Sequence, residues 1–263
     1  MLAKRIKDML RSGNVSIGAW MSTGHVSIAE ILAAAGYDWV VVETEHTAID
    51  VSEVLHLLMA IDGRGVIPLV RLAGIDAVQA KAVMDSGAGG VLVPMVNSKA
   101  DAMQAVGMVK YPPDGFRGVG LARAQGYGAT FADYMARAND ESLVIVQIEH
   151  VDAVRNIDEI LSVPGIDGTF IGPYDLSSSM GVPGQLQHPD VLAAMRHVLE
   201  ASLRHKVAPG IHLVHPDTAR DELQKRVAEG YSFVALGSDI LLLGDAARAL
   251  QSAARDVLSE LRR

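Results

Sequence analysis

The stretch GYDWVVVETEH, residues 36–46, contains the pattern that decides the fold. A glycine joint leads into the apolar, β-branched run Trp39–Glu43, and polar residues follow that run at once. Runs of this kind recur roughly eight times, each followed by an Ala- and Leu-rich segment with helical periodicity. This alternation is the signature of parallel βαβ units, so the sequence predicts an α/β fold of the (β/α)8 TIM barrel type.

The predicted strands are Val15–Trp20, Trp39–Glu43, Val66–Val70, Gly90–Pro94, Leu143–Ile148, Gly168–Ile171, Ala208–Ile211 and Phe233–Leu236. Glycine joints such as 36–38, 63–65 and 87–89 supply helix C-caps and sharp turns into the next strand. Charged and apolar positions alternate at helical spacing over Met1–Ser12, which predicts a leading helix. An open doubly wound sheet is the runner-up, but it needs a glycine-rich phosphate loop that Ser22-Thr23-Gly24-His25 does not supply.

Composition limits the classes of protein that remain. A length of 263 residues suits one barrel domain spanning 1–263, and 49% hydrophobic residues predict a sizeable core. The absence of cysteine excludes disulfides and thiolate chemistry, so oxygen or histidine must hold any metal, and the cytoplasm is the expected compartment. A formal charge of -8 without a basic run argues against a nucleic-acid partner. The apolar runs are far shorter than the roughly 20 residues of a membrane span, so no membrane association is expected.

Barrel enzymes build their sites at the carboxyl ends of the strands, and polar residues gather there in this sequence. Glu149 and Asp175 end successive strands, and two carboxylates with open positions for water and substrate suit a hard divalent cation such as magnesium or manganese. Each could instead be a solvated loop carboxylate or a helix N-cap. Gln147 lies two residues before Glu149, so both side chains face the same side of the strand.

Two further residues suggest acid–base and anion-stabilising roles. His46 closes the second strand, where an imidazole can exchange protons at neutral pH, although a capping or surface histidine is the simpler interpretation. Arg71 ends the third strand among apolar residues, where an arginine needs a carboxylate or a developing anion as its partner. Its guanidinium would stabilise an enolate or alkoxide oxygen, unless it forms only a structural salt bridge.

Motifs through nearly the whole chain resemble the class II 2-keto-3-deoxy acid aldolases of the HpcH/HpaI aldolase family. They are Tyr37-Asp38-Trp39 leading to Glu45-His46, Leu69-Val70-Arg71, Asp85-Ser86-Gly87-Ala88 with Val91-Leu92-Val93-Pro94-Met95-Val96, Gly115-Phe116-Arg117-Gly118, Gln147-Ile148-Glu149 and Phe170-Ile171-Gly172-Pro173-Tyr174-Asp175-Leu176-Ser177. The resemblance implies a barrel of the phosphoenolpyruvate/pyruvate type that cleaves a 4-hydroxy-2-oxo acid to pyruvate, or a related 2-keto acid, and an aldehyde. It also implies a homo-oligomer, with a hexamer as the leading candidate.

The resemblance assigns a role to each site residue. They are His46 as proton acceptor, Arg71 as transition-state stabiliser, Glu149 and Asp175 as ligands of magnesium, manganese or cobalt, and Gln147 with Gly172, Pro173, Tyr174 and Asp175 as the keto-acid cradle. Asp85 is implied to raise the basicity of the histidine. The strand map, however, puts Asp85 at a helix end on the opposite face, so it either reaches a site from a neighbouring subunit or only ends its helix.

The sequence departs from many relatives at two positions. Glu43 stands where they have aspartate, and its longer side chain could still orient the imidazole of His46. Tyr174 stands where they have a small residue, which leaves the shape of the substrate open.

Three other functions compete with the metal-dependent aldolase. A Schiff-base aldolase needs a strand lysine at the barrel mouth, and Lys81, Lys99, Lys110, Lys206 and Lys225 fall on predicted helices or their ends. A citrate-lyase-like enzyme acting on a coenzyme A thioester needs a basic groove, and no basic cluster is visible. A non-catalytic barrel serving as a binding module would have no reason to keep both carboxylates, His46 and Arg71.

Overall fold

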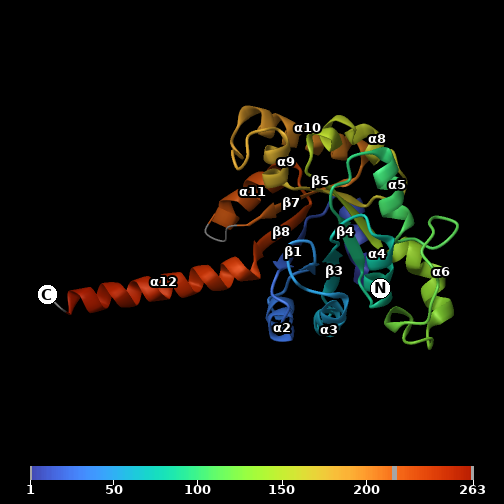
Figure 1. Ribbon diagram of the computed structural model, residues 1–263, viewed down its shortest axis with the longest axis horizontal. Coiled ribbons are helices and arrows are strands. Elements are labelled where there is room, and N and C mark those ends of the chain that lie inside the picture. The colour runs from blue at the N-terminus through green and yellow to red at the C-terminus, as the bar shows by residue number, and fades with distance from the viewer. Residues whose placement is uncertain (1, 215–217, 262–263) are drawn as a thin grey trace.

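The computed structural model describes residues 2–214 and 218–261. Over these residues, eight parallel strands pair in chain order, and β1 pairs with β8, so the sheet closes into a barrel (Figure 1). The strands are β1 (Ser16–Met21), β2 (Trp39–Glu43), β3 (Ile67–Arg71), β4 (Gly90–Val93), β5 (Leu143–Ile148), β6 (Gly168–Ile171), β7 (Ala208–Leu213) and β8 (Phe233–Ser238). The predicted TIM barrel is confirmed. Strands β7 and β8 run clearly further than predicted, because Leu213 of β7 pairs with Leu236 and Ser238 of β8 pairs with Trp20.

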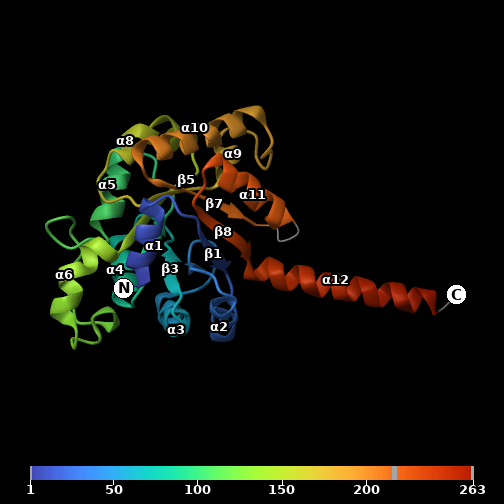
Figure 2. The ribbon, with the colours of Figure 1, turned by 180° about the vertical axis from the view of Figure 1, so that it is seen from behind.

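Helices cover the outside of the barrel between the strands (Figures 1 and 2). They are α1 (Leu2–Arg11), α2 (Val26–Ala34), α3 (Val51–Asp62), α4 (Ala77–Asp85), α5 (Lys99–Gly107), the 3-10 helix η1 (Arg123–Gln125), α6 (Phe131–Glu141), α7 (Val151–Arg155), α8 (Ile157–Leu161), α9 (Pro173–Ser179), α10 (Pro189–His205), α11 (Ala219–Glu229) and α12 (Asp239–Glu260). Within the described ranges, no helix is long and apolar enough to cross a membrane.

Alternate residues of each strand point into the barrel and form a closed inner core. Large apolar side chains such as Trp39, Leu69 and Phe233 fill it, and the Trp39 and Phe233 rings stack with their centroids 4.1 Å apart. The leading helix α1 covers the amino end of this core through Ile6 and Leu10, which are buried in the same cluster. Among the described residues, side chains therefore fill the barrel interior below the carboxyl ends of the strands.

The joints at the amino end use glycine as predicted. Gly36, Gly65 and Gly87 have φ angles of 93°, 75° and 103°, a region that other residues rarely adopt. These turns bring each helix directly back to the start of the next strand.

The last helix, α12, differs from the others because it projects away from the barrel (Figures 1 and 2). Every residue from 246 to 261 is exposed. Leu243, Leu250 and Val257 repeat every seven residues along it with 66%, 75% and 55% of their surface exposed. Ile17 of β1 and Leu236 of β8 remain only partly buried on the outer wall of the barrel. The chain thus leaves both an apolar helix stripe and a stretch of barrel wall without cover.

Candidate active site

A cleft of about 430 Å³ opens at the carboxyl ends of the strands. Its lining includes Glu43, His46, Arg71, Gln147 and the segment Gly172–Asp175. Residues from β2, β3, β5 and the loop after β6 therefore meet in one place, as the strand map predicted. Their convergence follows from the parallel barrel, which brings all carboxyl strand ends to one rim.

Arg71 is held by two carboxylates. Its Nη2 lies 2.5 Å from Glu43 Oε2, and its Nη1 lies 3.1 Å from Glu45 Oε2. The guanidinium carbon also lies 5.1 Å from the centre of the Trp20 ring, and Trp20 Nε1 donates to Glu43 Oε2 over 2.7 Å. Arg71 Nε has no hydrogen-bond partner among the described residues. The two ion pairs thus fix the position of the guanidinium, and its Nε–H remains without an acceptor.

His46 sits at the rim of the cleft with 66% of its side chain exposed. Its Nε2 lies 3.9 Å from Glu45 Oε2, while its backbone N–H donates to Glu43 Oε1 over 3.1 Å. Glu43 Oε1 also accepts the backbone N–H of Glu45 over 2.6 Å. The expectation that Glu43 could orient the imidazole is therefore not met in this structure, because its oxygens hold the loop backbone and Arg71. Glu45 is the carboxylate that faces the ring.

Glu149 is a buried carboxylate at the end of β5. Its Oε1 accepts the backbone N–H of Met95 over 2.7 Å, and its Oε2 accepts Gln147 Nε2. Met95 presents this N–H from a left-handed turn with φ of 52°. Burial raises the pKa of Glu149 to about 7, with the Met95 bond opposing the rise and the charges of Glu45 and Asp175 adding to it. Binding a proton or a cation would therefore stabilise this carboxylate.

Gly172, directly after β6, lets the next loop approach this carboxylate. A Cβ atom at this position would lie 2.7 Å from Glu149 Oε2 and 3.1 Å from Gln147 Nε2, so only glycine fits without displacement. Pro173 then begins α9 and puts Asp175 in its first turn, where it is exposed. Tyr174 projects into solvent at the rim with 52% of its surface exposed. The structure thus brings the predicted cradle residues together around Glu149.

The donor set fits a hard divalent cation. Asp175 lines the cleft, and the buried Glu149 accepts a hydrogen bond from Gln147, which also lines it. The charges of Glu45 and Asp175 both raise the pKa of Glu149. Gln147 Oε1 is buried without a hydrogen-bond partner in the described chain. Among the residues that the structure describes, no three His, Asp or Glu side chains lie close enough together to hold a metal ion. The protein would therefore supply two carboxylates and leave the other coordination positions to water and substrate. That division suits magnesium or manganese better than a structural zinc.

Two residues of the site escaped the sequence analysis. His212 and Trp20 line the cleft, and their rings stack with centroids 4.9 Å apart. Strand parity could have identified His212, because it lies two residues after Gly210 on the inward face, but the predicted strand ended at Ile211. Burial lowers the pKa of His212 to about 4, so its ring is neutral near pH 7.

Asp85 lies outside this cluster. It ends α4, and its Oδ1 lies 2.5 Å from Nη2 of the buried Arg117, whose guanidinium also stacks over Tyr111. The structure therefore agrees with the strand map, which places Asp85 at a helix end on the opposite face. Within one chain this ion pair, and not His46, is the partner of Asp85.

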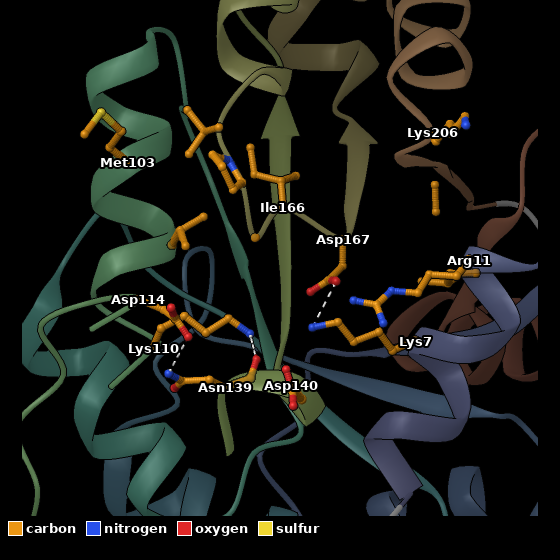
Figure 3. A pocket seen from close by; sticks show the side chains of 16 residues that line it. Lys7, Arg11, Met103, Lys110, Asp114, Asn139, Asp140, Ile166, Asp167 and Lys206 are labelled. Atoms are coloured by element: carbon orange, nitrogen blue, oxygen red, sulfur yellow. Dashed lines mark hydrogen bonds and ion pairs between the residues drawn. The ribbon is translucent and has the colours of Figure 1, made fainter. Parts of the chain in front are cut away.

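A second cavity, of about 500 Å³, lies at the amino end of the barrel (Figure 3). Lys7 Nζ lies 3.1 Å from Asp167 Oδ1, and Lys110 Nζ donates to Asn139 O, Ser142 O and Ser142 Oγ at 2.5, 2.7 and 3.1 Å. Burial, and then the charge of Lys7, lower the pKa of Lys110 to about 7, although the charges of Asp167 and Asp140 oppose this shift. This is the lysine chemistry a Schiff-base enzyme needs, but it lies at the wrong end of the barrel.

Comparisons with known proteins agree with the geometry. The model of the HpcH/HpaI aldolase/citrate lyase family matches residues 16–246. A 4-hydroxy-2-oxo-heptane-1,7-dioate aldolase from Shigella sonnei (strain Ss046) is 43% identical over 247 residues, 93% of this chain and 92% of the relative. A hydroxypyruvate/pyruvate aldolase from Sagittula stellata is 42% identical over 93% of this chain and 95% of the relative.

A solved structure extends the likeness to three dimensions. An HpcH/HpaI aldolase/citrate lyase family protein from Burkholderia cenocepacia J2315 superposes with a TM-score of 0.90 at 36% identity. The match covers 96% of this chain and 99% of that one. Sequence and fold similarity therefore run over the same, nearly complete length.

Proposed function

Because the chain belongs to the HpcH/HpaI aldolase/citrate lyase family, we propose that it is a class II pyruvate aldolase. It cleaves a 4-hydroxy-2-oxo acid reversibly into pyruvate, or a related 2-keto acid, and an aldehyde. The observation that carries the proposal is the meeting of Arg71 with the Gln147–Glu149 pair at one cleft whose described lining contains no lysine. Such a cleft can stabilise an enolate but cannot form a Schiff base.

Glu149 and Asp175 are the residues that would hold magnesium, manganese or cobalt. A cation held by them would supply Lewis-acid chemistry, which would make the carbon next to the keto group of the substrate more acidic. Gln147 and the backbone of Gly172–Tyr174 orient the carboxylate end of the keto acid. Arg71 offers Nε and its fixed positive charge to the oxygen on which negative charge develops.

His46 is the proposed proton carrier. In cleavage, His46 takes the proton of the C4 hydroxyl and the C3–C4 bond breaks. The electron pair of that bond forms the enolate of pyruvate, and the aldehyde leaves. Protonation of the enolate at C3 then gives pyruvate. Glu45, 3.9 Å from the imidazole, can stabilise its protonated form. In synthesis the same steps run backwards.

The competing functions have less support. The coenzyme A thioester lyase needs several cations along a groove, and Arg71 is the one arginine or lysine among the described lining residues of the cleft. The non-catalytic barrel would not maintain a buried carboxylate with a pKa near 7 against the cost of its burial.

A second copy of this chain is the proposed partner. The stripe Leu243, Leu250 and Val257 repeats every seven residues on the projecting α12, a spacing suited to packing against another helix or wall. The partly covered Ile17 and Leu236 lie where an eighth outer helix would pack. A homo-oligomer, up to a hexamer, would cover both surfaces. Light scattering tests this, and a fully active monomer near 27.9 kDa would refute it.

One experiment decides the function. The purified protein is incubated with pyruvate and a panel of aldehydes, with and without added magnesium, manganese or cobalt, and products are identified by mass spectrometry. Metal-dependent formation of 4-hydroxy-2-oxo acids is the expected result, and chelation should abolish it. Full activity after exhaustive chelation, or a pyruvate adduct trapped by borohydride, would overturn the class II assignment.

A further inference from the structure

His212 holds a fixed place in the wall of the cleft. It is the inward-facing residue near the end of β7, and its ring stacks on Trp20 at 4.9 Å with an interplanar angle of 21°. Trp20 is itself anchored, because its Nε1 donates to Glu43 Oε2 over 2.7 Å. The imidazole is therefore clamped against the same network that positions Arg71.

The hydrogen bond of His212 determines which ring nitrogen carries the proton. Nε2 lies 3.0 Å from the carbonyl oxygen of Gly237, and a carbonyl can only accept, so Nε2 is the protonated nitrogen. Burial lowers the pKa of the ring to about 4, which keeps it neutral near pH 7. Nδ1 must then carry a lone pair. It has no partner in the described chain and is not among the buried unpaired atoms, so it is open to the cleft.

Among the described lining residues of the cleft, Arg71 is the one lysine or arginine, and Ser22 and Ser238 offer only neutral hydroxyls. Val214, Ile240 and Leu241 add apolar surface. The positive charge of Arg71 is already shared by Glu43 and Glu45. A second carboxylate on the substrate would find no unpaired cation among the described lining residues, whereas a hydroxyl would find an acceptor next to an apolar surface.

We propose that His212 is a specificity-determining residue for the aldehyde half of the substrate, with Nδ1 accepting a hydrogen bond from a hydroxyl carried by the aldehyde. The preferred aldehydes are small, uncharged and hydroxylated, such as glycolaldehyde or glyceraldehyde. The inference rests on the proposed aldolase function and adds the class of its second substrate. It distinguishes this chain from the Shigella sonnei relative, whose name specifies a dioate and hence a substrate with two carboxylates.

The experiment compares addition of pyruvate to glycolaldehyde, acetaldehyde and succinic semialdehyde, measured as kcat/KM for each aldehyde. Wild type should prefer glycolaldehyde to acetaldehyde by about tenfold, which corresponds to roughly 1.4 kcal/mol for one well-placed hydrogen bond. Succinic semialdehyde should be the poorest of the three.

Two matched variants separate the role of Nδ1 from the role of the ring. His212→Asn places an amide oxygen near the position of Nδ1 and should keep most of the preference. His212→Gln can still donate to the Gly237 carbonyl but has no acceptor at the Nδ1 position, so its ratio of kcat/KM for glycolaldehyde to kcat/KM for acetaldehyde should fall to about one. His212→Phe keeps the stacking surface and should behave as Gln does.

A second measurement tests enolate formation separately from the use of the aldehyde. Exchange of the pyruvate methyl protons with deuterated water, followed by NMR, reports enolate formation without any aldehyde. Normal exchange combined with equal use of glycolaldehyde and acetaldehyde by wild type overturns the role of His212 alone. An equal loss on both aldehydes in His212→Gln makes the residue merely structural. Absence of both exchange and aldol product in the metal-loaded wild type overturns the aldolase, and the hydroxyl preference with it.

Discussion

The two ends of the barrel hold cavities of similar size and opposite character. The amino-end cavity is the larger, at about 500 Å³ against 430 Å³ for the cleft at the carboxyl end. Two of its lysines have acceptors, since Lys110 Nζ has three and Lys7 pairs with Asp167. None of the described residues lining it has a buried atom without a partner, whereas Arg71 Nε and Gln147 Oε1 in the cleft are such atoms.

The difference shows that volume does not identify the site. A buried polar atom without a partner costs about 1–3 kcal/mol. Other such atoms occur elsewhere in the described chain, for example Arg117 Nε, but Arg71 Nε and Gln147 Oε1 belong to residues that line one cleft. At the amino end the charges hold segments of one chain together. At the carboxyl end we propose that they bind a substrate and a cation. The predictions that follow test this division, from the largest expected effect to the smallest.

Glu149→Gln should produce the greatest loss, lowering kcat by at least about 10³-fold together with the affinity for manganese, because a bound cation contributes several kcal/mol to the transition state. Aldol turnover set beside calorimetric metal binding measures both. The matched control is Asp167→Asn at the amino end, which should leave turnover and metal affinity unchanged. Equal loss of turnover in the two variants would erase the distinction between the ends.

His46→Ala should lower turnover by roughly 10²- to 10⁴-fold, the usual contribution of general acid–base catalysis, while manganese affinity stays near wild type. The residue is exposed at the rim, so folding should not change. Loss of metal binding along with activity would make His46 a ligand. Near-native turnover would assign the proton transfer to another group, with Glu45 the next candidate.

Arg71→Lys should lower kcat by about 10²- to 10³-fold, the range for removing a donor to a developing oxyanion. Lysine keeps the charge but cannot span Glu43 and Glu45 while offering a third donor. Steady-state kinetics with the pyruvate KM recorded separately provide the measurement. A change confined to KM would show that Arg71 binds the ground state only.

Lys110→Met should affect stability and leave catalysis alone. Removing the ammonium group takes the Lys110 donor away from Asn139 O and Ser142 Oγ, while Ser142 O keeps Lys7 Nζ at 3.1 Å. The loss should lower the free energy of unfolding by about 1–3 kcal/mol. Urea denaturation followed by circular dichroism measures this loss, and kcat should stay within about twofold of wild type. A catalytic defect in a stable variant would mean that the amino end takes part in the reaction.

The smallest expected effect at neutral pH is that of His212, because its contribution to stability changes only as the pH falls below about 6.5. Its folded pKa is about 4 against 6.5 for the free ring, so the unfolded chain binds more protons between these values. The contribution of His212 to the free energy of unfolding is complete above pH 6.5 and is lost as the pH falls toward 4. The loss is at most roughly 3 kcal/mol. The charge of Arg71 lowers the pKa of His212 and the charge of Glu43 raises it. Both residues are therefore kept as in wild type in the proteins that are compared. His212→Asn should flatten this decline in urea titrations at several pH values.

The sequence by itself determined the barrel and the composition of its rim. The period of two in the strands, the helical periodicity between them and joints such as Gly36 and Gly87 are local signals that each segment carries alone. Parallel order then requires all carboxyl strand ends to share one rim, so Arg71, Gln147 and Glu149 were bound to meet.

Only the tertiary structure decided how those side chains are paired. The choice of Glu43 and Glu45 as partners of Arg71, and of Arg117 as partner of Asp85, depends on distances between segments far apart in the chain. The same holds for the clamping of His212 on Trp20 and for the departure of α12 from the barrel. Desolvation and charge at one atom depend on every neighbour that packing brings near it, and a pattern along the chain does not contain those distances.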